Sequence, residues 1–151
     1  MPLFIDKLAI SSPDFDGLTR IPDRLTADGG NDIPALVLSG APEGTVELAI
    51  IVHDPDAPLA HGFTHWVVYG IPADATALDL TVEGVREAPN GTTGTTWFGP
   101  QPPVGHGQHH YYFWVYALNA PVDGTPTREE FLALHADSII EQARYVGTFS
   151  R

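Results

Sequence analysis

Runs of β-branched and aromatic residues, separated by proline and glycine, constrain the fold of this chain most strongly. Residues 45–52 place an apolar side chain at every second position, and residues 64–71 and 110–118 are rich in Val, Tyr and Trp. Such runs are typical of strands in a packed sheet. Two shorter candidate strands lie at 3–10 and 35–39, and 14 prolines and 15 glycines interrupt the segments between strands. The pattern predicts a mainly β fold, a β-sandwich with long connecting loops.

Helix signals are confined to the C-terminal part of the chain. Thr127 is followed three residues later by Glu130, which is the spacing of a capping box at the start of a helix. Ile139, Ile140 and Ala143 can share one helical face, so we expect a second helix over 137–145. A closing strand is predicted at 146–149.

Length, cysteine content and charge exclude several classes of protein. The 151 residues predict a single domain over 1–151. The absence of cysteine excludes disulfides, thiolate metal sites and a cysteine nucleophile. A net charge of −12 with one lysine and six scattered arginines argues against nucleic-acid binding through a basic patch. No apolar run approaches the roughly 20 residues of a transmembrane helix, and the N-terminus lacks signal-peptide features, so we expect a cytoplasmic protein.

Acidic and imidazole side chains gather where the predicted strands begin and end. Asp54 and Asp56 flank Pro55 directly after one strand, while His65 and His109 each begin another. Alternation along the third strand places His109, Tyr111, Phe113 and Val115 on one face, and along the second it places His65, Val67, Tyr69 and Ile71 together. Each feature has a plain structural interpretation, as turn aspartates and core-edge histidines. Their combination favours a pocket in which the carboxylates accept from the imidazoles and raise the imidazole pKa.

A proline-glycine loop at 99–107 supplies a third element. Its first half carries Pro100, Pro102 and Pro103 and predicts a rigid apolar wall. Backbone amides of residues 104–107 could donate to an anion. A cis peptide bond before Pro58, in the aspartate loop, is left open.

These motifs, in this order and at these separations, resemble the phosphatidylethanolamine-binding protein family. The segments that carry the resemblance are Asp54-Pro55-Asp56-Ala57-Pro58, then His65-Trp66 with its strand, then Gly99-Pro100-Gln101-Pro102-Pro103 and His109-His110-Tyr111. The similarity is greatest to the short bacterial and archaeal branch, the Raf-kinase-inhibitor-like proteins. The resemblance implies a β-sandwich of a large central antiparallel sheet and a smaller sheet, with short helices near the C-terminus.

The resemblance also implies a small surface pocket for anions such as phosphate or a phospholipid head group. Carried over by position, the ligand-binding residues are Asp54, Asp56, His65, Gly99, Pro100, Pro102, His109 and Tyr111. The family usually has arginine where this chain has His110, so we expect a structural ion pair to be lost there. Trp97 and Phe98 replace the family's usual Tyr-Gly and should reshape the entrance.

The sequence therefore predicts a protein that binds a small anionic or zwitterionic ligand, such as phosphate or a phosphoethanolamine-type head group, without a cofactor. Regulation of a kinase or another protein partner through the same pocket is a related expectation. Relatives of this branch are often dimers, so a homodimer is one expected state. The alternative is a metal-assisted or acid–base hydrolase, with zinc held by His65, His109 and Asp54. No nucleophile elbow or phosphate-binding loop accompanies the pocket, which favours binding over catalysis.

Overall fold

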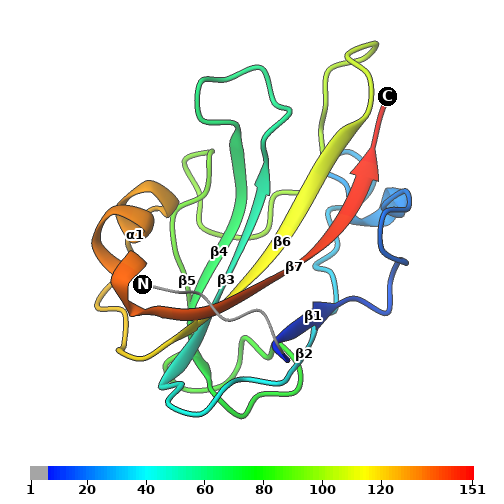
Figure 1. The fold of residues 1–151 in the computed structure, drawn as a ribbon. Coiled ribbons are helices and arrows are strands. Elements are labelled where there is room, and N and C mark those ends of the chain that lie inside the picture. The colour runs from blue at the N-terminus through cyan, green and yellow to red at the C-terminus, as the bar shows by residue number, and fades with distance from the viewer. Residues whose placement is uncertain (1–6) are drawn as a thin grey trace.

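A five-stranded antiparallel sheet forms the centre of the computed structural model, which describes residues 7–151 (Figure 1). Its strand order is β5-β4-β3-β6-β7, and a separate two-stranded sheet pairs β1 with β2. The large sheet comprises β3 (Glu47–Asp54), β4 (Phe63–Pro72), β5 (Arg86–Glu87), β6 (His109–Leu118) and β7 (Ile139–Phe149). The remaining elements are β1 (Ala9–Ser11), β2 (Val37–Ser39), α1 (Arg128–His135) and two 3₁₀ turns, Asp23–Leu25 and Ala136–Ser138. The predicted mainly β fold with two sheets is confirmed.

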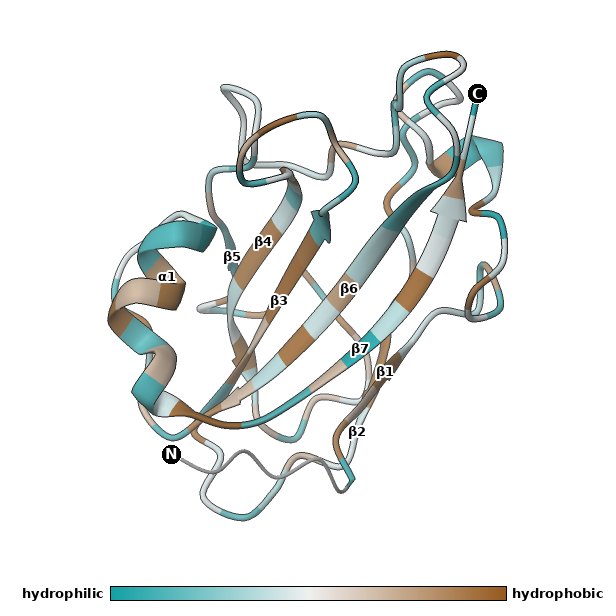
Figure 2. Cartoon of the chain, turned by 45° about the horizontal axis from the view of Figure 1, so that its top comes forward, coloured by the Kyte–Doolittle hydropathy of each residue, from teal (hydrophilic) through white to brown (hydrophobic). Residues whose placement is uncertain are grey.

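The central strand β3 is buried on both faces, because each face of the large sheet has its own hydrophobic cover. Every residue of β3 is buried, and the strand is hydrophobic over most of its length (Figure 2). On one face Ile50 and Phe113 pack in the same cluster as Leu38 of the small sheet. On the other face Ile51 packs with Phe131 of α1. The small sheet and α1 therefore lie on opposite sides of the large sheet (Figure 1).

The capping box predicted at the start of the helix is present. Thr127 Oγ1 accepts from the Glu130 amide at 3.2 Å, and Glu130 Oε1 accepts from the Thr127 amide at 3.3 Å. These two bonds satisfy amides that have no partner within the helix. The fully buried Phe131 then anchors α1 against the rings of Tyr69 and Tyr116.

The prediction of a helix over 137–145 is wrong, because most of that segment belongs to the edge strand β7. β7 pairs with β6 from Ile139 to Phe149, and only a short 3₁₀ turn precedes it. Ile139 and Glu141 are buried while Ile140 is half-buried, which is the two-residue period of a strand. The expected closing strand at 146–149 is the end of this longer strand. At the other terminus, residues 3–6 of the expected 3–10 strand lie outside the described residues, and β1 begins at Ala9.

Irregular pairing between β3 and β4 changes which face the β4 side chains occupy. Val52 pairs with Trp66, but the next residue, His53, pairs with Thr64, so His65 is an extra residue in β4. Such a bulge turns the side chain and breaks the alternation. A second shift at Gly70, whose φ is +75°, moves Ile71 to the face of Val68. The expectation that His65, Val67, Tyr69 and Ile71 share a face is therefore wrong.

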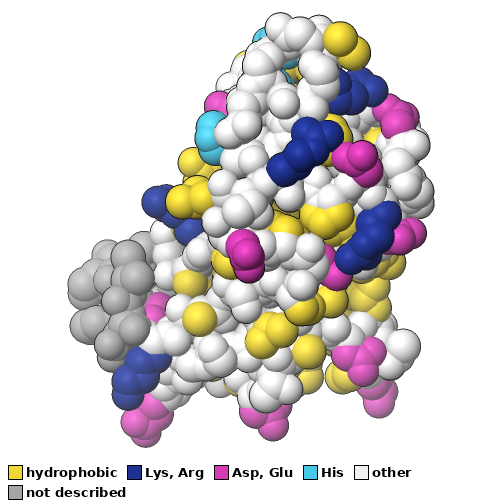
Figure 3. All heavy atoms as spheres, turned by 90° about the vertical axis from the view of Figure 1, so that its right-hand side faces the viewer, with side chains coloured by type: hydrophobic (Ala, Val, Ile, Leu, Met, Phe, Trp, Pro, Cys, Tyr) yellow, Lys and Arg dark blue, Asp and Glu magenta, His cyan; other side chains and the backbone are white. Residues whose placement is uncertain are grey.

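Cationic side chains do not gather on the surface that Figure 3 shows, where they are separated by acidic and uncharged groups. No helix within residues 7–151 is long and apolar enough to cross a membrane.

Candidate functional site

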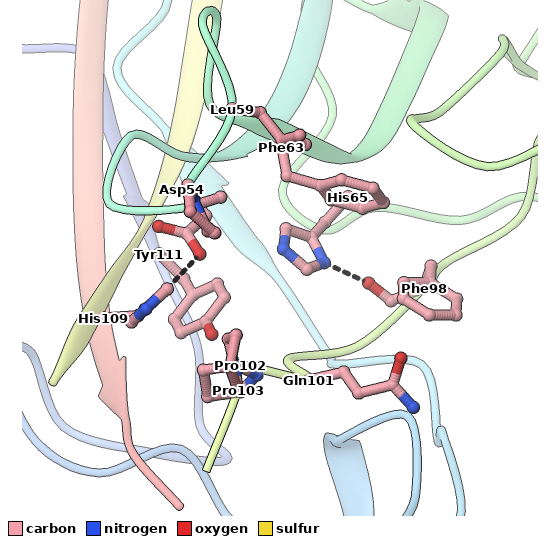
Figure 4. Close-up of a pocket in the computed structure, with 12 residues that line it drawn as sticks. Asp54, Leu59, Phe63, His65, Phe98, Gln101, Pro102, Pro103, His109 and Tyr111 are labelled. Carbon is pink, nitrogen blue, oxygen red and sulfur yellow. Dashed lines mark hydrogen bonds and ion pairs between the residues drawn. The ribbon is translucent and has the colours of Figure 1, made fainter. Parts of the chain in front are cut away.

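A cavity of about 250 Å³ opens where β3 ends and where β4 and β6 begin (Figure 4). Because neighbouring strands are antiparallel, these three strand ends meet at one edge of the sheet. The loops after β3 and before β6 complete the walls. The lining residues are Asp54, Ala57, Pro58, Leu59, Phe63, His65, Phe98, Gln101, Pro102, Pro103, His109 and Tyr111.

Asp54, the last residue of β3, is a buried carboxylate with partners for both oxygens. Its Oδ2 accepts from His109 Nδ1 at 2.7 Å, and its Oδ1 accepts from the Asp56 amide at 2.8 Å. Burial, partly offset by the hydrogen bond from His109, raises the pKa of Asp54 above its ordinary value. Asp54 thus fixes both the His109 ring and the turn that follows β3.

His109 is held through both ring nitrogens. Its Nε2 lies 2.7 Å from His106 Nδ1, on the opposite side of the ring from Asp54. A carboxylate cannot donate, so His109 Nδ1 carries a proton. The result is a chain from buried Asp54 through His109 to exposed His106.

His65 does not contact either aspartate, which corrects the expected imidazole–carboxylate pairing at this residue. Its Nδ1 donates to the Phe98 carbonyl oxygen, and the ring packs edge-on against Tyr111 at a centroid distance of 5.1 Å. Burial lowers the pKa of His65 from 6.5 to about 4, the opposite of the expected rise. His65 is therefore a neutral imidazole at physiological pH, and its Nε2 is an acceptor.

The Tyr111 hydroxyl is buried and has no hydrogen-bond partner among the described residues. Burial raises the pKa of Tyr111 above its ordinary value, so the hydroxyl stays a neutral O–H. An unpaired buried hydroxyl costs free energy, on the order of 1–3 kcal/mol, unless a ligand or water satisfies it. Tyr111 lines the cavity, so its hydroxyl is a candidate donor to a ligand that binds there (Figure 4).

Asp56 lies outside the cavity and fastens the aspartate loop to β6. Its Oδ2 accepts from the His110 backbone amide at 2.8 Å and from His110 Nδ1 at 2.7 Å. The His110 side chain therefore contacts an acidic partner at this position, where the loss of an ion pair was expected. The peptide bond before Pro58 is trans, as are all the others in the described chain.

Gly99 and Pro100 do not line the cavity, but they position the adjacent residues 101–103, which form one of its walls. A side chain at Gly99 would place its Cβ 2.1 Å from the Leu25 carbonyl oxygen, and the Pro100 carbonyl accepts from Ala27 at 3.1 Å. Asn31 closes the same region, donating to the Trp97 carbonyl and accepting from the Gly99 amide. This close backbone packing requires glycine at position 99.

Arg151 and Asp28 form hydrogen bonds that position Gln101 and Pro102 in the same wall. Arg151 donates to the Pro102 carbonyl at 2.7 Å and to Asp28 at 2.7 Å, while Gln101 donates to Asp28 at 2.9 Å.

The free amides expected at 104–107 are only partly available. The Gly105 amide donates to the Arg151 carbonyl, and the His106 amide donates to Pro103. Neither residue lines the cavity, so the Gly105 and His106 amides are not available to an anion there.

Comparison with known proteins adds an independent observation. The family model described as phosphatidylethanolamine-binding protein matches residues 11–150. The chain belongs to the phosphatidylethanolamine-binding protein family. A UPF0098 protein of Methanothermobacter thermautotrophicus is 36% identical over 146 residues, covering 91% of this chain and 95% of its own.

Solved structures of this family share the fold over nearly the whole chain. The crystal structure of E. coli YbcL matches with a TM-score of 0.88 at 29% identity, covering 95% of this chain and 98% of that one. The structure of the Chlamydia trachomatis homologue CT736 matches with a TM-score of 0.85 at 26% identity, covering 95% and 97%.

In this family member the cavity brings together five of the eight predicted site residues: Asp54, His65, Pro102, His109 and Tyr111. Asp56, Gly99 and Pro100 lie behind its walls. Pro103 belongs to the predicted apolar wall, but the apolar lining from Leu59 and Phe63 was not predicted, and its only signal in the sequence is proximity to the predicted polar positions. Among residues 7–151, no group of three His, Asp or Glu side chains converges in a way that could hold a metal ion.

Proposed function

We propose that this protein binds a small phosphorylated ligand of the phosphoethanolamine type in the cavity at the ends of β3, β4 and β6. One observation carries the proposal: the buried Tyr111 hydroxyl has no partner, and the His65 ring lies against it with an acceptor nitrogen open to the cavity. A ligand with an oxygen for Tyr111 and a donor for His65 satisfies both groups. Membership of a family named for phosphatidylethanolamine supports a phosphorylated head group.

The eight predicted residues have two roles in this proposal. Asp54, His65, Pro102, His109 and Tyr111 line the cavity, and of these His65 and Tyr111 make the polar contacts to the ligand. Asp56, Gly99 and Pro100 position the two loops that carry the walls. The apolar side chains of the lining exclude water and strengthen the few polar contacts.

Titration with phosphoethanolamine, followed by NMR or calorimetry, tests the proposal. We expect a dissociation constant in the millimolar range, about −4 kcal/mol, because the contacts are few and the ligand is small. Tyr111→Phe should weaken binding about tenfold by removing one hydrogen bond to a charged group. Because that hydroxyl is unpaired in the free protein, the same variant should not lower the free energy of unfolding.

Tyr112→Phe is the matched control, since Tyr112 projects from the opposite face of β6 against Trp114. Absence of binding by the wild type, or equal weakening by both variants, would contradict the proposal. Regulation of a kinase or other protein partner, a homodimeric state, a cytoplasmic location and the alternative hydrolase activity stay predictions from sequence and family resemblance.

A further inference from the structure

The cavity presents a hydrogen-bond acceptor where an anion site usually presents a donor. A carbonyl oxygen has no proton, so His65 Nδ1 must supply the hydrogen in its bond to Phe98. The neutral ring then leaves Nε2 as a bare acceptor, and this nitrogen faces the cavity (Figure 4). The pKa of His65, lowered by burial to about 4, keeps the ring in this state across the physiological range.

The charged and titratable groups around His65 do not compensate for the missing donor. β3 contributes His53 and Asp54, and β6 contributes His109 and Tyr111. The facing wall, residues 98–103, contains no charged side chain.

No lysine or arginine appears among the described residues that line the cavity. Arg151 lies behind the wall, bonded to Pro102 and Asp28. A ligand therefore meets one carboxylate, Asp54, and no permanent cation.

We infer that the cavity selects the protonated, monoanionic form of a phosphomonoester over its dianion and over sulfate esters. In this arrangement the ligand P–O–H donates to His65 Nε2, and an unprotonated oxygen accepts from the Tyr111 hydroxyl. The inference rests on the proposed function and specifies the charge state that it takes.

The selection follows from the direction of the hydrogen bonds. A dianion or a sulfate oxygen has only lone pairs to offer, so it would face the His65 lone pair with no proton between them. Two buried acceptors that face one another cannot form a hydrogen bond, and both have lost their contacts with water. The second negative charge of a dianion would also be repelled by Asp54, which lines the same cavity.

Methyl phosphate and methyl sulfate form the ligand pair that tests this inference. Both are monoanions at pH 5, and they differ in the P–O–H that only the phosphate carries. Phosphomonoesters lose this proton with a pKa of about 6, whereas the sulfate ester does not titrate in the range used. Any titration of the protein therefore appears in the methyl sulfate curve and can be subtracted.

We expect methyl phosphate to bind at least about tenfold more tightly than methyl sulfate at pH 5, the size of one hydrogen bond to a charged group. Its affinity should fall at least about tenfold between pH 5 and pH 8 as the proton is lost, while that of methyl sulfate changes little.

Two substitutions distinguish the role of the His65 acceptor from that of the Tyr111 hydroxyl, which donates to both ligands. His65→Gln offers an amide that can donate as well as accept, so it should reduce the preference for phosphate and flatten the pH dependence. Tyr111→Phe should weaken both ligands equally and leave their ratio unchanged. His135→Gln, in α1 and outside the cavity, is the matched control and should alter neither ratio nor affinity.

Equal affinity for the two esters at pH 5, or methyl phosphate binding that strengthens toward pH 8, would overturn the inference while leaving the proposed function intact. Failure of phosphoethanolamine and both esters to bind at either pH would overturn the proposed function itself.

Discussion

His109 Nδ1 lies 2.7 Å from Asp54 Oδ2, and the two side chains are only 2% and 4% exposed. The other ring nitrogen of His109 contacts His106. Both nitrogens are therefore committed within the protein, and the His109 ring holds the wall rather than reaching a ligand. The polar contacts left open in the cavity come from its neighbours His65 and Tyr111.

Asp54→Asn should lower the free energy of unfolding by about 1–3 kcal/mol. Both Asp54 oxygens accept from donors, and an amide replaces one of them with a donor that faces another donor. Urea denaturation measures the loss. Asp74→Asn makes the same change of charge at an exposed position and should shift stability by less than about 0.5 kcal/mol. Equal effects of the two substitutions would show that the Asp54–His109 contact contributes nothing.

Stability should fall as the pH drops from 6.5 to about 4, because burial lowers the pKa of both His65 and His53 to about 4. Over this interval the unfolded chain binds protons that the folded chain excludes. The contribution of the two neutral histidines to the free energy of unfolding is therefore fully present above pH 6.5 and is progressively lost below it. For His65 the full loss amounts to at most about 3 kcal/mol.

Urea denaturation at a series of pH values measures this dependence. His65→Gln should remove part of it, and His135→Gln should leave it unchanged. An equal pH dependence of the free energy of unfolding in the wild type and in His65→Gln would contradict the neutral, buried state of His65.

The long strands and the capping box could be predicted because each depends on local pattern. Thr127 and Glu130 satisfy one another over three residues, and the two-residue period of 45–52 is visible without a partner strand. The stretch 137–145 could not be assigned in this way. Its Ile139, Ile140 and Ala143 fit a helix face as well as a strand, and only pairing with β6 decides between them.

The candidate site was predictable where strand ends bring residues together and unpredictable where the backbone departs from regular pairing. Asp54, His109 and Tyr111 meet because their strands are adjacent. The bulge at His65 depends on register with β3, and the carbonyl that fixes its tautomer lies 33 residues away at Phe98. The alternation of residues along one strand shows neither the register with β3 nor the contact with Phe98, so the predicted imidazole–aspartate contact at His65 was wrong.

Gly99→Ala should destabilise the protein by about 1–3 kcal/mol and weaken ligand binding. The new Cβ would lie 2.1 Å from the Leu25 carbonyl oxygen, so the wall at 99–103 must move. Gly94→Ala in the preceding loop is the matched control, because its Cβ would meet only Thr92 Oγ1 at 3.4 Å. Thermal unfolding and phosphoethanolamine titration measure the two effects, and identical behaviour of the two variants would refute the close packing at Gly99.

The Asp56–His110 contact should fasten the aspartate loop with a modest energy that a double-mutant cycle can measure. Asp56 Oδ2 accepts from both the backbone amide and the ring of His110. The two side chains are 41% and 42% exposed, so solvent weakens the interaction between them. We expect Asp56→Ala to cost about 1 kcal/mol, and His110→Ala to cost less because the backbone bond to Asp56 survives.

The coupling energy from the cycle should be below about 1 kcal/mol and should shrink in high salt, as for other exposed pairs. His110→Arg should keep stability within about 0.5 kcal/mol of the wild type, because a guanidinium at this position can also donate to Asp56. A coupling energy of zero together with a neutral Asp56→Ala would mean that the loop is positioned by Asp54 and the prolines alone. Hydrogen exchange of the amides in residues 56–62 provides the second readout: exchange should be faster in Asp56→Ala than in His110→Ala, because only the former loses both bonds to β6.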